Sequence, residues 1–188
     1  MRLILASSSP RRADLLQQIG LRFTVRAADI DESVLPGEAP NAYVARMAIA
    51  KGREVSRLCA ADDCVLAADT AVIVDGRILG KPSSRGDAAM MLRRLSGRSH
   101  EVMTAVSVHY GEALRVAISR TEVFFASLSD AEINNYLNTG EADDKAGGYG
   151  IQGHAACFVQ RIHGSYSGVV GLPLYETVDL LKQVGFSR

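Results

Sequence analysis

The sequence predicts an α/β fold, and three observations support that class. Signals for strands and helices alternate along the 188 residues, as they do in proteins whose helices cover a sheet. Residues 64–74 form a nearly continuous apolar run, which is typical of a buried strand. Apolar residues make up 47% of the chain and charged residues 22%, which excludes a disordered, collagenous or coiled-coil protein. We predict a single domain over residues 1–188.

The first 40 residues are predicted to form a strand, a helix, a second strand and a loop. The apolar residues 2–5 are expected to be a short buried strand. Ser9 followed by Pro10 is typical of the start of a helix, where Ser is the N-cap and Pro the first helical residue. Residues 22–26 return as a strand, and residues 29–40 are a loop because they hold two prolines and several carboxylates.

The next segment is predicted to be a long helix followed by a hairpin. Residues 41–58 carry a helical period. The apolar side chains expected on one face of this helix are Val44, Met47, Ala48, Val55 and Leu58. The strand at 64–74 ends at Asp75-Gly76, a turn signal, and residues 77–79 are expected to pair back with it.

A helix and two long strands are predicted next. Ser83 or Ser84 is a suitable N-cap for a helix that reaches Leu95, and Gly97 follows its end. Residues 101–109 and 113–126 have the composition of long strands. Gly111 lies between the two strands, so they are expected to turn around it.

The last third of the chain adds a capped helix, a glycine-rich loop, a strand and a final helix. Residues 129–132 form a capping box for a helix that extends to about Leu137. Residues 140–153 are rich in glycine and are expected to be a loop, and 156–163 to be a strand. Pro173 begins an amphipathic helix.

Charge and composition limit the cell compartment and the binding partners that we expect for this protein. The 21 basic and 21 acidic residues cancel, so no overall field favours binding to nucleic acid. The chain has no 18-residue apolar stretch, so no membrane span is expected, and its first apolar run is too short for a signal sequence. Its three cysteines have no metal-type spacing and are expected to be small buried residues. We predict a reduced, cytoplasmic protein.

Two arginines stand where a helix disfavours them. Arg11 and Arg12 lie in the first turn of a helix whose N-terminus already carries partial positive charge. A bound anion would reverse this penalty, because free backbone N–H groups, the hydroxyl of Ser7 and guanidinium groups all suit phosphate oxygens. The alternative is that both arginines point into solvent.

Two further charges interrupt apolar patterns. Lys51 lies on the apolar face of its helix, so it either extends along that face to water or reaches into a cleft. Asp69 interrupts the buried strand, where an ionised carboxylate costs several kcal/mol unless it is paired or bound to a metal. A structural aspartate near a bend is the alternative to a metal ligand or general base.

Two glycine-containing segments complete the candidate site. Gly80-Lys81-Pro82 follows the hairpin, and the loop at 144–153 has glycines that let a backbone approach a ligand closely, although a mobile surface loop is the alternative. With Asp69 and Glu32, the cationic and hydroxyl groups have the composition of a site for phosphate and a divalent cation. The four histidines lack zinc or triad spacing and are expected on strand surfaces or loops; they are His100, His109, His154 and His163.

Six blocks in a fixed order carry a resemblance to a known family. They are Ser7-x-Ser9-Pro10-Arg11-Arg12, Ala68-Asp69-Thr70, Gly80-Lys81-Pro82, Leu95-Ser96-Gly97-x-x-His100, Asp144-Lys145-Ala146-Gly147-x-Tyr149-x-Ile151-Gln152-Gly153 and Gly164-Ser165-Tyr166-Ser167-x-Val169-Val170-Gly171-Leu172-Pro173. Each block alone is weak, but the ordered set covers nearly the whole chain. It resembles the Maf proteins.

The resemblance implies a nucleoside triphosphate pyrophosphatase with an inosine-triphosphatase-like fold. Such a fold has a long twisted mixed sheet and two lobes around a central cleft. The block at 144–153 is similar to that of the branch that acts on dTTP and UTP, and differs from that of the 7-methyl-GTP branch. The resemblance also implies a homodimer and a divalent metal, Mg²⁺ or Mn²⁺.

The resemblance also assigns roles residue by residue. Asp69 would be the proton acceptor, and Asp69 with Glu32 would hold the metal. The substrate-specificity positions would be Arg12, Thr70 and Gln152. The phosphate-binding positions would be Ser7, Arg11, Lys51 and Lys81. One departure is Gly52, where the family usually has alanine; it weakens the helix by about 1 kcal/mol but leaves Lys51 in place.

Two other functions remain open at this point. Maf proteins are linked to septum formation, so the chain can be a non-catalytic nucleotide-binding regulator of cell division. The second alternative is an ITP or XTP pyrophosphatase. A panel of nucleotides distinguishes these functions, because only an enzyme produces pyrophosphate and each branch prefers different bases.

Overall fold

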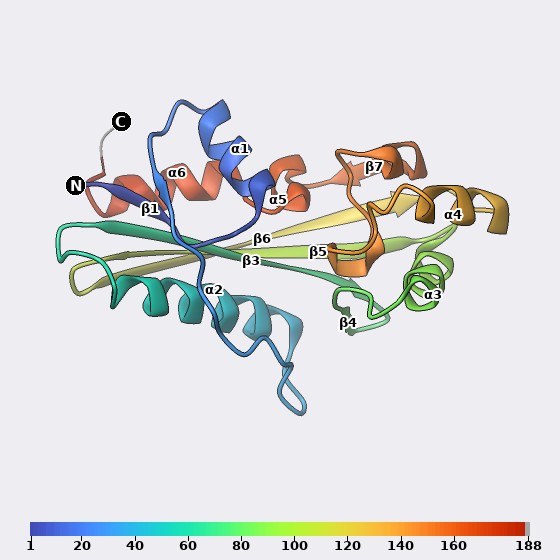
Figure 1. The fold of residues 1–188 in the computed structure, drawn as a ribbon, viewed down its shortest axis with the longest axis horizontal. Helices are drawn as coiled ribbons and strands as arrows, with labels where there is room; N and C mark the ends of the chain where they lie inside the picture. The colour runs from blue at the N-terminus through green and yellow to red at the C-terminus, as the bar shows by residue number, and fades with distance from the viewer. Residues whose placement is uncertain (187–188) are drawn as a thin grey trace.

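A mixed seven-stranded sheet forms the centre of the protein (Figure 1). The computed structural model describes residues 1–186. The strands are β1 (Leu3–Leu5), β2 (Thr24–Val25), β3 (Cys64–Val74), β4 (Arg77–Leu79), β5 (Ser99–Tyr110), β6 (Ala113–Phe125) and β7 (Val159–His163). Their order is β2-β1-β3-β5-β6-β7, with β4 paired to β3. Strand β1 is parallel to β2 and β3, and the other pairs are antiparallel. The predicted α/β class and mixed sheet are confirmed.

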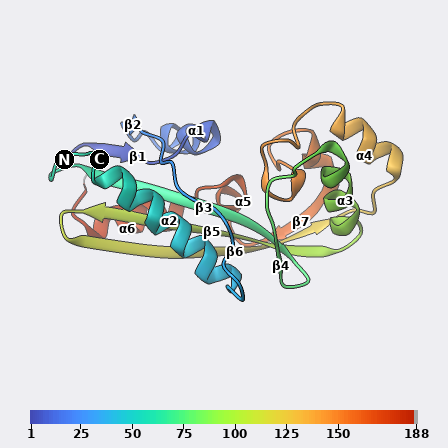
Figure 2. The same ribbon diagram turned by 60° about the horizontal axis from the view of Figure 1, so that its bottom comes forward.

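Helices cover both faces of the sheet. The α-helices are α1 (Pro10–Gln18), α2 (Pro40–Ser56), α3 (Arg85–Leu95), α4 (Asp130–Leu137), α5 (Tyr166–Val170) and α6 (Leu174–Gln183). Helices α1, α5 and α6 lie on one face, and α2 lies on the other (Figure 1). Helices α3 and α4 lie at the far end of the long strands β3, β5 and β6, near β7 (Figure 2). None of the helices in residues 1–186 has the length and apolar character needed to cross a membrane.

Separate apolar clusters occupy the two ends of the long strands. At one end, α1 and α6 pack on β1, β3 and β5 through buried residues that include Leu5, Leu16, Leu66 and Leu181. At the other end, α3 and α4 pack on the opposite ends of β3, β5 and β6 through residues that include Val72, Leu92, Phe125 and Ile133. The strands run through both clusters, which fits the expected two lobes. The single domain over 1–188 stays a prediction, and residues 187–188 lie outside the described residues.

Strand β3 has an edge that is open in its middle. One edge pairs with β5 over residues 65–73. On the other edge β1 pairs with residues 64–66 and β4 with residues 72–74. Residues 67–71 therefore have no strand partner on that edge within the described part of the chain. The gap leaves the middle of this strand without a strand neighbour on one side, and of residues 67–71 all but Thr70 are buried.

Several predicted boundaries are wrong. Helix α2 ends at Ser56 rather than residue 58, so Leu58 leaves the apolar face and is 64% exposed. The predicted strand at 156–163 begins only at Val159, because residues 154–158 form a 3₁₀ helix, η2 (His154–Phe158). The predicted strand at 22–26 pairs only through Thr24 and Val25. Each error lies at the end of an element, where pairing and packing outweigh local pattern.

Two short helices were not predicted. The glycine-rich segment contains a 3₁₀ turn, η1 (Ala146–Gly148). Helix α5 has five residues, too few to show a helical period, and it contains a glycine. Its signal is the cap at Ser165, whose hydroxyl accepts a hydrogen bond from the backbone N–H of Gly168 at 3.0 Å.

The predicted exposure of some histidines and cysteines is wrong. His100 is not on a surface: it is 4% exposed, and its Nε2 lies 2.7 Å from the hydroxyl of Tyr149. The Nδ1 of His100 is buried and has no hydrogen-bond partner among residues 1–186, and desolvation lowers the pKa of His100 to about 4. Cys64 is buried as expected, but Cys157 is exposed and Cys59 is partly exposed. Tertiary packing decides which of these residues are buried. Local sequence does not predict it, because histidine and cysteine each occur in both buried and exposed positions.

Gly52 makes room for His109. A Cβ atom at Gly52 would overlap the His109 ring and lie 3.1 Å from the hydroxyl of Ser107. We therefore expect Gly52→Ala to lower the free energy of unfolding by about 1–3 kcal/mol, although alanine favours a helix. Denaturant unfolding measures this change. The matched control is Gly86→Ala in α3, where the nearest atom is 3.8 Å away and stability should be unchanged or higher. An equal effect at both positions would contradict the packing explanation.

Candidate active site

A cleft of about 800 Å³ opens at the unpaired middle of β3. Its wall includes residues from α1, α2, β3, the segment after β4 and the glycine-rich segment. All nine site residues predicted from the sequence line it: Ser7, Arg11, Arg12, Glu32, Lys51, Asp69, Thr70, Lys81 and Gln152. The fold therefore brings together residues that are up to 145 positions apart (7 to 152).

Asp69 and Thr70 reach opposite faces of the sheet. Side chains alternate along a strand, so Asp69 shares the α2 face with Ala67 and Ala71, and Thr70 shares the α1 face with Ala68. Both line the cleft beside the open edge of β3, although Asp69 is only 6% exposed. One strand thus presents a carboxylate to α2 and a hydroxyl to α1 within a single cleft.

On the α1 face, a chain of hydrogen bonds fixes Arg12. Its guanidinium donates to the carbonyl of Gly171 at 2.8 Å, to the hydroxyl of Ser7 at 3.1 Å and to that of Thr70 at 3.3 Å. Three of its five N–H groups are thereby used, so two remain for a ligand. Neither arginine simply points into solvent, since the Arg11 side chain is only 28% exposed and faces Asp144.

The direction of the hydroxyl groups in this chain can be assigned. Thr104 donates its single hydroxyl hydrogen to the carbonyl of Gly168 at 2.7 Å. The bond of 2.9 Å between the Thr70 and Thr104 hydroxyls must therefore be donated by Thr70. The oxygen of Thr70 is then oriented to accept from Arg12, which orders the floor of the cleft.

On the α2 face, Lys51 joins two carboxylates. Its ammonium lies 2.7 Å from an oxygen of Asp69 and 2.7 Å from an oxygen of Glu32. The side chain of Lys51 is only 12% exposed, so it reaches the cleft instead of extending to water. The second oxygen of Asp69 accepts no hydrogen bond from the described residues and is not sealed from solvent. That oxygen is available to a ligand or a water molecule.

The two carboxylates have opposite pKa shifts. Burial raises the pKa of Asp69, and the charges of Lys51 and Arg12 with the Lys51 hydrogen bond offset only part of this effect. Burial also acts to raise the pKa of Glu32, but the hydrogen bond and charge of Lys51 hold it below its ordinary value. Asp69 is therefore more basic than an ordinary aspartate, and Glu32 is less basic than an ordinary glutamate.

Two residues of α2 anchor the acidic loop that carries Glu32. The hydroxyl of Tyr43 donates to the carbonyl of Glu32 at 3.0 Å. Arg46 donates two hydrogen bonds of 2.6 Å to the carboxylate of Glu38 and one of 3.0 Å to the carbonyl of Ser33. Bidentate pairing of this kind holds the loop against the helix. Tyr43 and Arg46 were not predicted as site residues, because their only signal in the sequence is their position before Lys51 on the same helix.

The glycine-rich segment closes the other side of the cleft. Gly147 has φ of +70°, and a Cβ there would lie 2.9 Å from Val72, so the segment packs directly on β3. Gly147 also donates its backbone N–H to the carbonyl of Gly80 at 3.0 Å, which joins the two glycine segments. This segment is therefore not a free surface loop. Gln152 and Lys81 line the cleft and make no side-chain hydrogen bond with residues 1–186.

Comparisons with known proteins agree over nearly the whole chain. The model of the family described as Maf-like protein matches residues 2–184. A protein of Anaeromyxobacter dehalogenans named dTTP/UTP pyrophosphatase is 55% identical, over 98% of this chain and 95% of its own. A protein of Chromobacterium violaceum with the same name is 53% identical, over 98% of this chain and 96% of its own.

Solved structures resemble the chain at low identity. One is a nucleoside-triphosphatase, or dITP/XTP pyrophosphatase, from Mycobacterium abscessus, with 18% identity and a TM-score of 0.43 over 68% of this chain and 74% of its own. Another is the Ham1 protein of Staphylococcus aureus, with 16% identity and a TM-score of 0.48 over 67% of this chain and 72% of its own. The family match and the identity of the sequence relatives are decisive: the chain belongs to the Maf family.

Proposed function

We propose that this protein is a nucleoside triphosphate pyrophosphatase that hydrolyses dTTP and UTP to the monophosphate and pyrophosphate. The observation that carries the proposal is the pairing of Lys51 with Asp69 and Glu32 at the open edge of β3, inside a cleft that also holds Arg11, Arg12 and Lys81. The names of relatives more than 50% identical to the chain support the choice of substrates.

Asp69 acts as the proton acceptor in this mechanism. Water attacks the α-phosphorus of the substrate, and the bond to the pyrophosphate group breaks. One oxygen of Asp69 is held by Lys51, and the other is free to accept a proton from the attacking water. A buried carboxylate with a raised pKa is a better base than an exposed aspartate.

Cationic side chains stabilise the charge that develops on the leaving pyrophosphate. Arg11 on α1, Lys51 on α2 and Lys81 after β4 come from different walls of the cleft. Ser7, whose hydroxyl lies beside Arg12, adds a donor for a phosphate oxygen. Groups placed before the reaction need no reorganisation as charge moves, which makes them effective in the transition state.

The donor set suits a divalent cation. Asp69 and Glu32 already converge on one cation, the ammonium of Lys51, with an oxygen of each at 2.7 Å. No group of three or more potential ligands from His, Cys, Asp and Glu occurs within the described residues. Mg²⁺ commonly takes one or two carboxylates and completes its shell with phosphate oxygens and water, and Mn²⁺ accepts a similar shell. When bound, such an ion would neutralise phosphate charge.

Arg12, Thr70 and Gln152 are the proposed specificity residues. Gln152 carries both a donor and an acceptor, so it can pair with the O4 and N3–H edge of uracil or thymine. Arg12 and Thr70 form part of an ordered hydrogen-bond chain, so their remaining donors and acceptors have fixed directions. Fixed partners discriminate between bases better than mobile ones, because a wrong base leaves them unpaired.

A nucleotide panel tests the function. Purified protein is incubated with Mg²⁺ and dTTP, UTP, CTP, ITP or 7-methyl-GTP, and pyrophosphate and orthophosphate are assayed separately. We expect pyrophosphate from dTTP and UTP, without orthophosphate. Orthophosphate would place the attack at the γ-phosphorus, and a preference for ITP would favour the purine enzyme. No product from a folded sample would favour the non-catalytic division regulator.

We also propose a cytoplasmic homodimer that does not bind nucleic acid. The cytoplasmic location is supported by three free cysteines. The absence of nucleic acid binding is supported by the balance of 21 basic and 21 acidic residues. The dimer is supported only by the family resemblance, and sedimentation velocity measures it directly.

A further inference from the structure

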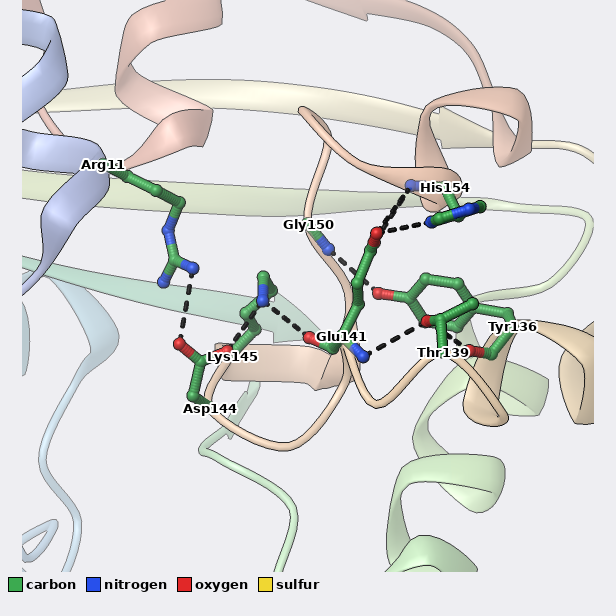
Figure 3. A network of polar contacts seen from close by, with 8 residues as sticks. All are labelled: Arg11, Tyr136, Thr139, Glu141, Asp144, Lys145, Gly150 and His154. Carbon is green, nitrogen blue, oxygen red and sulfur yellow. Dashed lines mark hydrogen bonds and ion pairs between the residues drawn. The ribbon is translucent and has the colours of Figure 1, made fainter.

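Asp144 and Lys145 lie in the cleft but have no part in the proposed mechanism. Both residues line the cleft wall formed by the glycine-rich segment. Figure 3 shows Arg11 extending toward Asp144 from α1, on the other side of the cleft. Asp144 and Lys145 therefore lie opposite Arg11, a residue that we assign to phosphate binding.

Asp144 lies between two cations. One of its oxygens lies 2.7 Å from the ammonium of Lys145, and the other lies 3.5 Å from the guanidinium of Arg11. The hydrogen bond from Lys145 keeps the pKa of Asp144 below its ordinary value, so it is a carboxylate at neutral pH. An anion held between an ammonium and a guanidinium has the surroundings that a phosphate oxygen would require.

Lys145 is held in a fixed direction. Its ammonium donates to the carbonyl of Glu141 at 2.6 Å, and its side chain is only 17% exposed. Its aliphatic part lies over Gly150, where a Cβ would be 2.7 Å from Cε. With bonds to Glu141 and Asp144, the ammonium retains one donor, and it would have two without Asp144.

The segment beneath Lys145 is itself anchored. The carboxylate of Glu141 accepts from the backbone N–H of His154 at 2.9 Å and lies 2.5 Å from its ring Nδ1 (Figure 3). Gly150 donates its N–H to the hydroxyl of Tyr136 at 3.3 Å. The segment that supplies the carbonyl orienting Lys145 is therefore tied to α4 and η2, so Lys145 is held more firmly than a lysine on an open surface.

We propose that Lys145 is a further phosphate-binding residue and that Asp144 occupies the phosphate position between Lys145 and Arg11 until substrate displaces it. This inference rests on the proposed function for its substrate class. Asp144 competes with phosphate for both cations, so it weakens the binding of any polyphosphate regardless of the base. It also offsets part of the positive charge of the two cations while the cleft holds no substrate.

Binding of inorganic pyrophosphate tests this proposal without turnover. Calorimetry is performed on the full chain and on Asp144→Asn and Lys145→Met. We expect Asp144→Asn to bind pyrophosphate about three to ten times more tightly, because one competing charge is removed. We expect Lys145→Met to bind it about ten times more weakly. For UTP, Lys145→Met should raise KM more than it lowers kcat.

Matched control variants separate the effect of the position in the cleft from the effect of the change in net charge. Asp143→Asn makes the same charge change next to Asp144, at an exposed residue outside the cleft lining, and should leave pyrophosphate binding unchanged. Lys182→Met on α6 is the control for Lys145. Equal or weaker binding by Asp144→Asn would overturn the competition, and unchanged binding by Lys145→Met would overturn its role. Failure of the nucleotide panel would reject the proposed substrates without affecting this measurement.

Discussion

Asp69→Asn should lower kcat for UTP by about 100-fold or more while the protein stays folded. The amide has the shape of the carboxylate, and its oxygen can still accept the hydrogen bond from Lys51 that Asp69 accepts at 2.7 Å. It cannot take a proton from water, so only the base is removed. Steady-state kinetics measure kcat, and circular dichroism with thermal unfolding checks the fold.

Asp63→Asn is the matched control for this loss. Asp63 is also a buried carboxylate with a cationic partner, since its oxygen lies 2.8 Å from Nε of Arg2, but it is outside the cleft. Its replacement should lower stability and leave kcat unchanged. A folded Asp69→Asn protein with nearly full activity would reject Asp69 as the base, whatever the behaviour of Asp63→Asn.

Lys51→Met should reduce kcat/KM by about 100-fold and move the acid limb of its pH profile to higher pH. The loss is expected because a phosphate-binding cation is removed and two carboxylates lose their shared partner. The shift is expected because burial raises the pKa of Asp69 and Lys51 opposes that effect. The base must be deprotonated, so activity falls as the pH drops through this pKa, and a higher pKa moves the fall upward.

The measurement is kcat/KM for UTP between about pH 5 and 9. Lys81→Met is the control, because Lys81 lines the same cleft but is not among the main groups that shift the pKa of Asp69. It should lower kcat/KM without moving the acid limb. An unmoved limb in Lys51→Met would show that Lys51 does not influence the base, and the role of Asp69 would need revision.

The helices and strands of this protein could be predicted from the sequence where their hydrophobic patterns extend over many residues. The apolar run at 64–74 is β3, with the same bounds, and the apolar period of residues 41–58 is α2 with an error of one residue at its start and two at its end. The capping box at Ser129 is formed as predicted. Short elements such as α5 were not predicted, because a helix of five residues is too short to show a helical period in the sequence.

Four residues of the candidate site, Arg11, Arg12, Lys51 and Asp69, could be predicted because each conflicts with its local pattern, whereas Thr70 and Gln152 came only from the family resemblance. An aspartate in a buried strand, a lysine on an apolar helix face and arginines at a helix N-terminus all cost free energy unless a partner is present. For Lys51 and Asp69 the structure shows that the partner is the other residue, at 2.7 Å. Such conflicts indicate that a site exists, but they do not identify the partners.

Tertiary structure alone decided how the site is assembled. The gap between β1 and β4 on one edge of β3 lies beside Asp69 and Thr70, which line the cleft, and it depends on strand pairing between distant segments. The burial of His100 and the position of Asp144 opposite Arg11 likewise arise from packing of the two ends of the sheet. Sequence patterns extend over a few residues, whereas these contacts join residues up to 133 positions apart, so only the folded chain determines them.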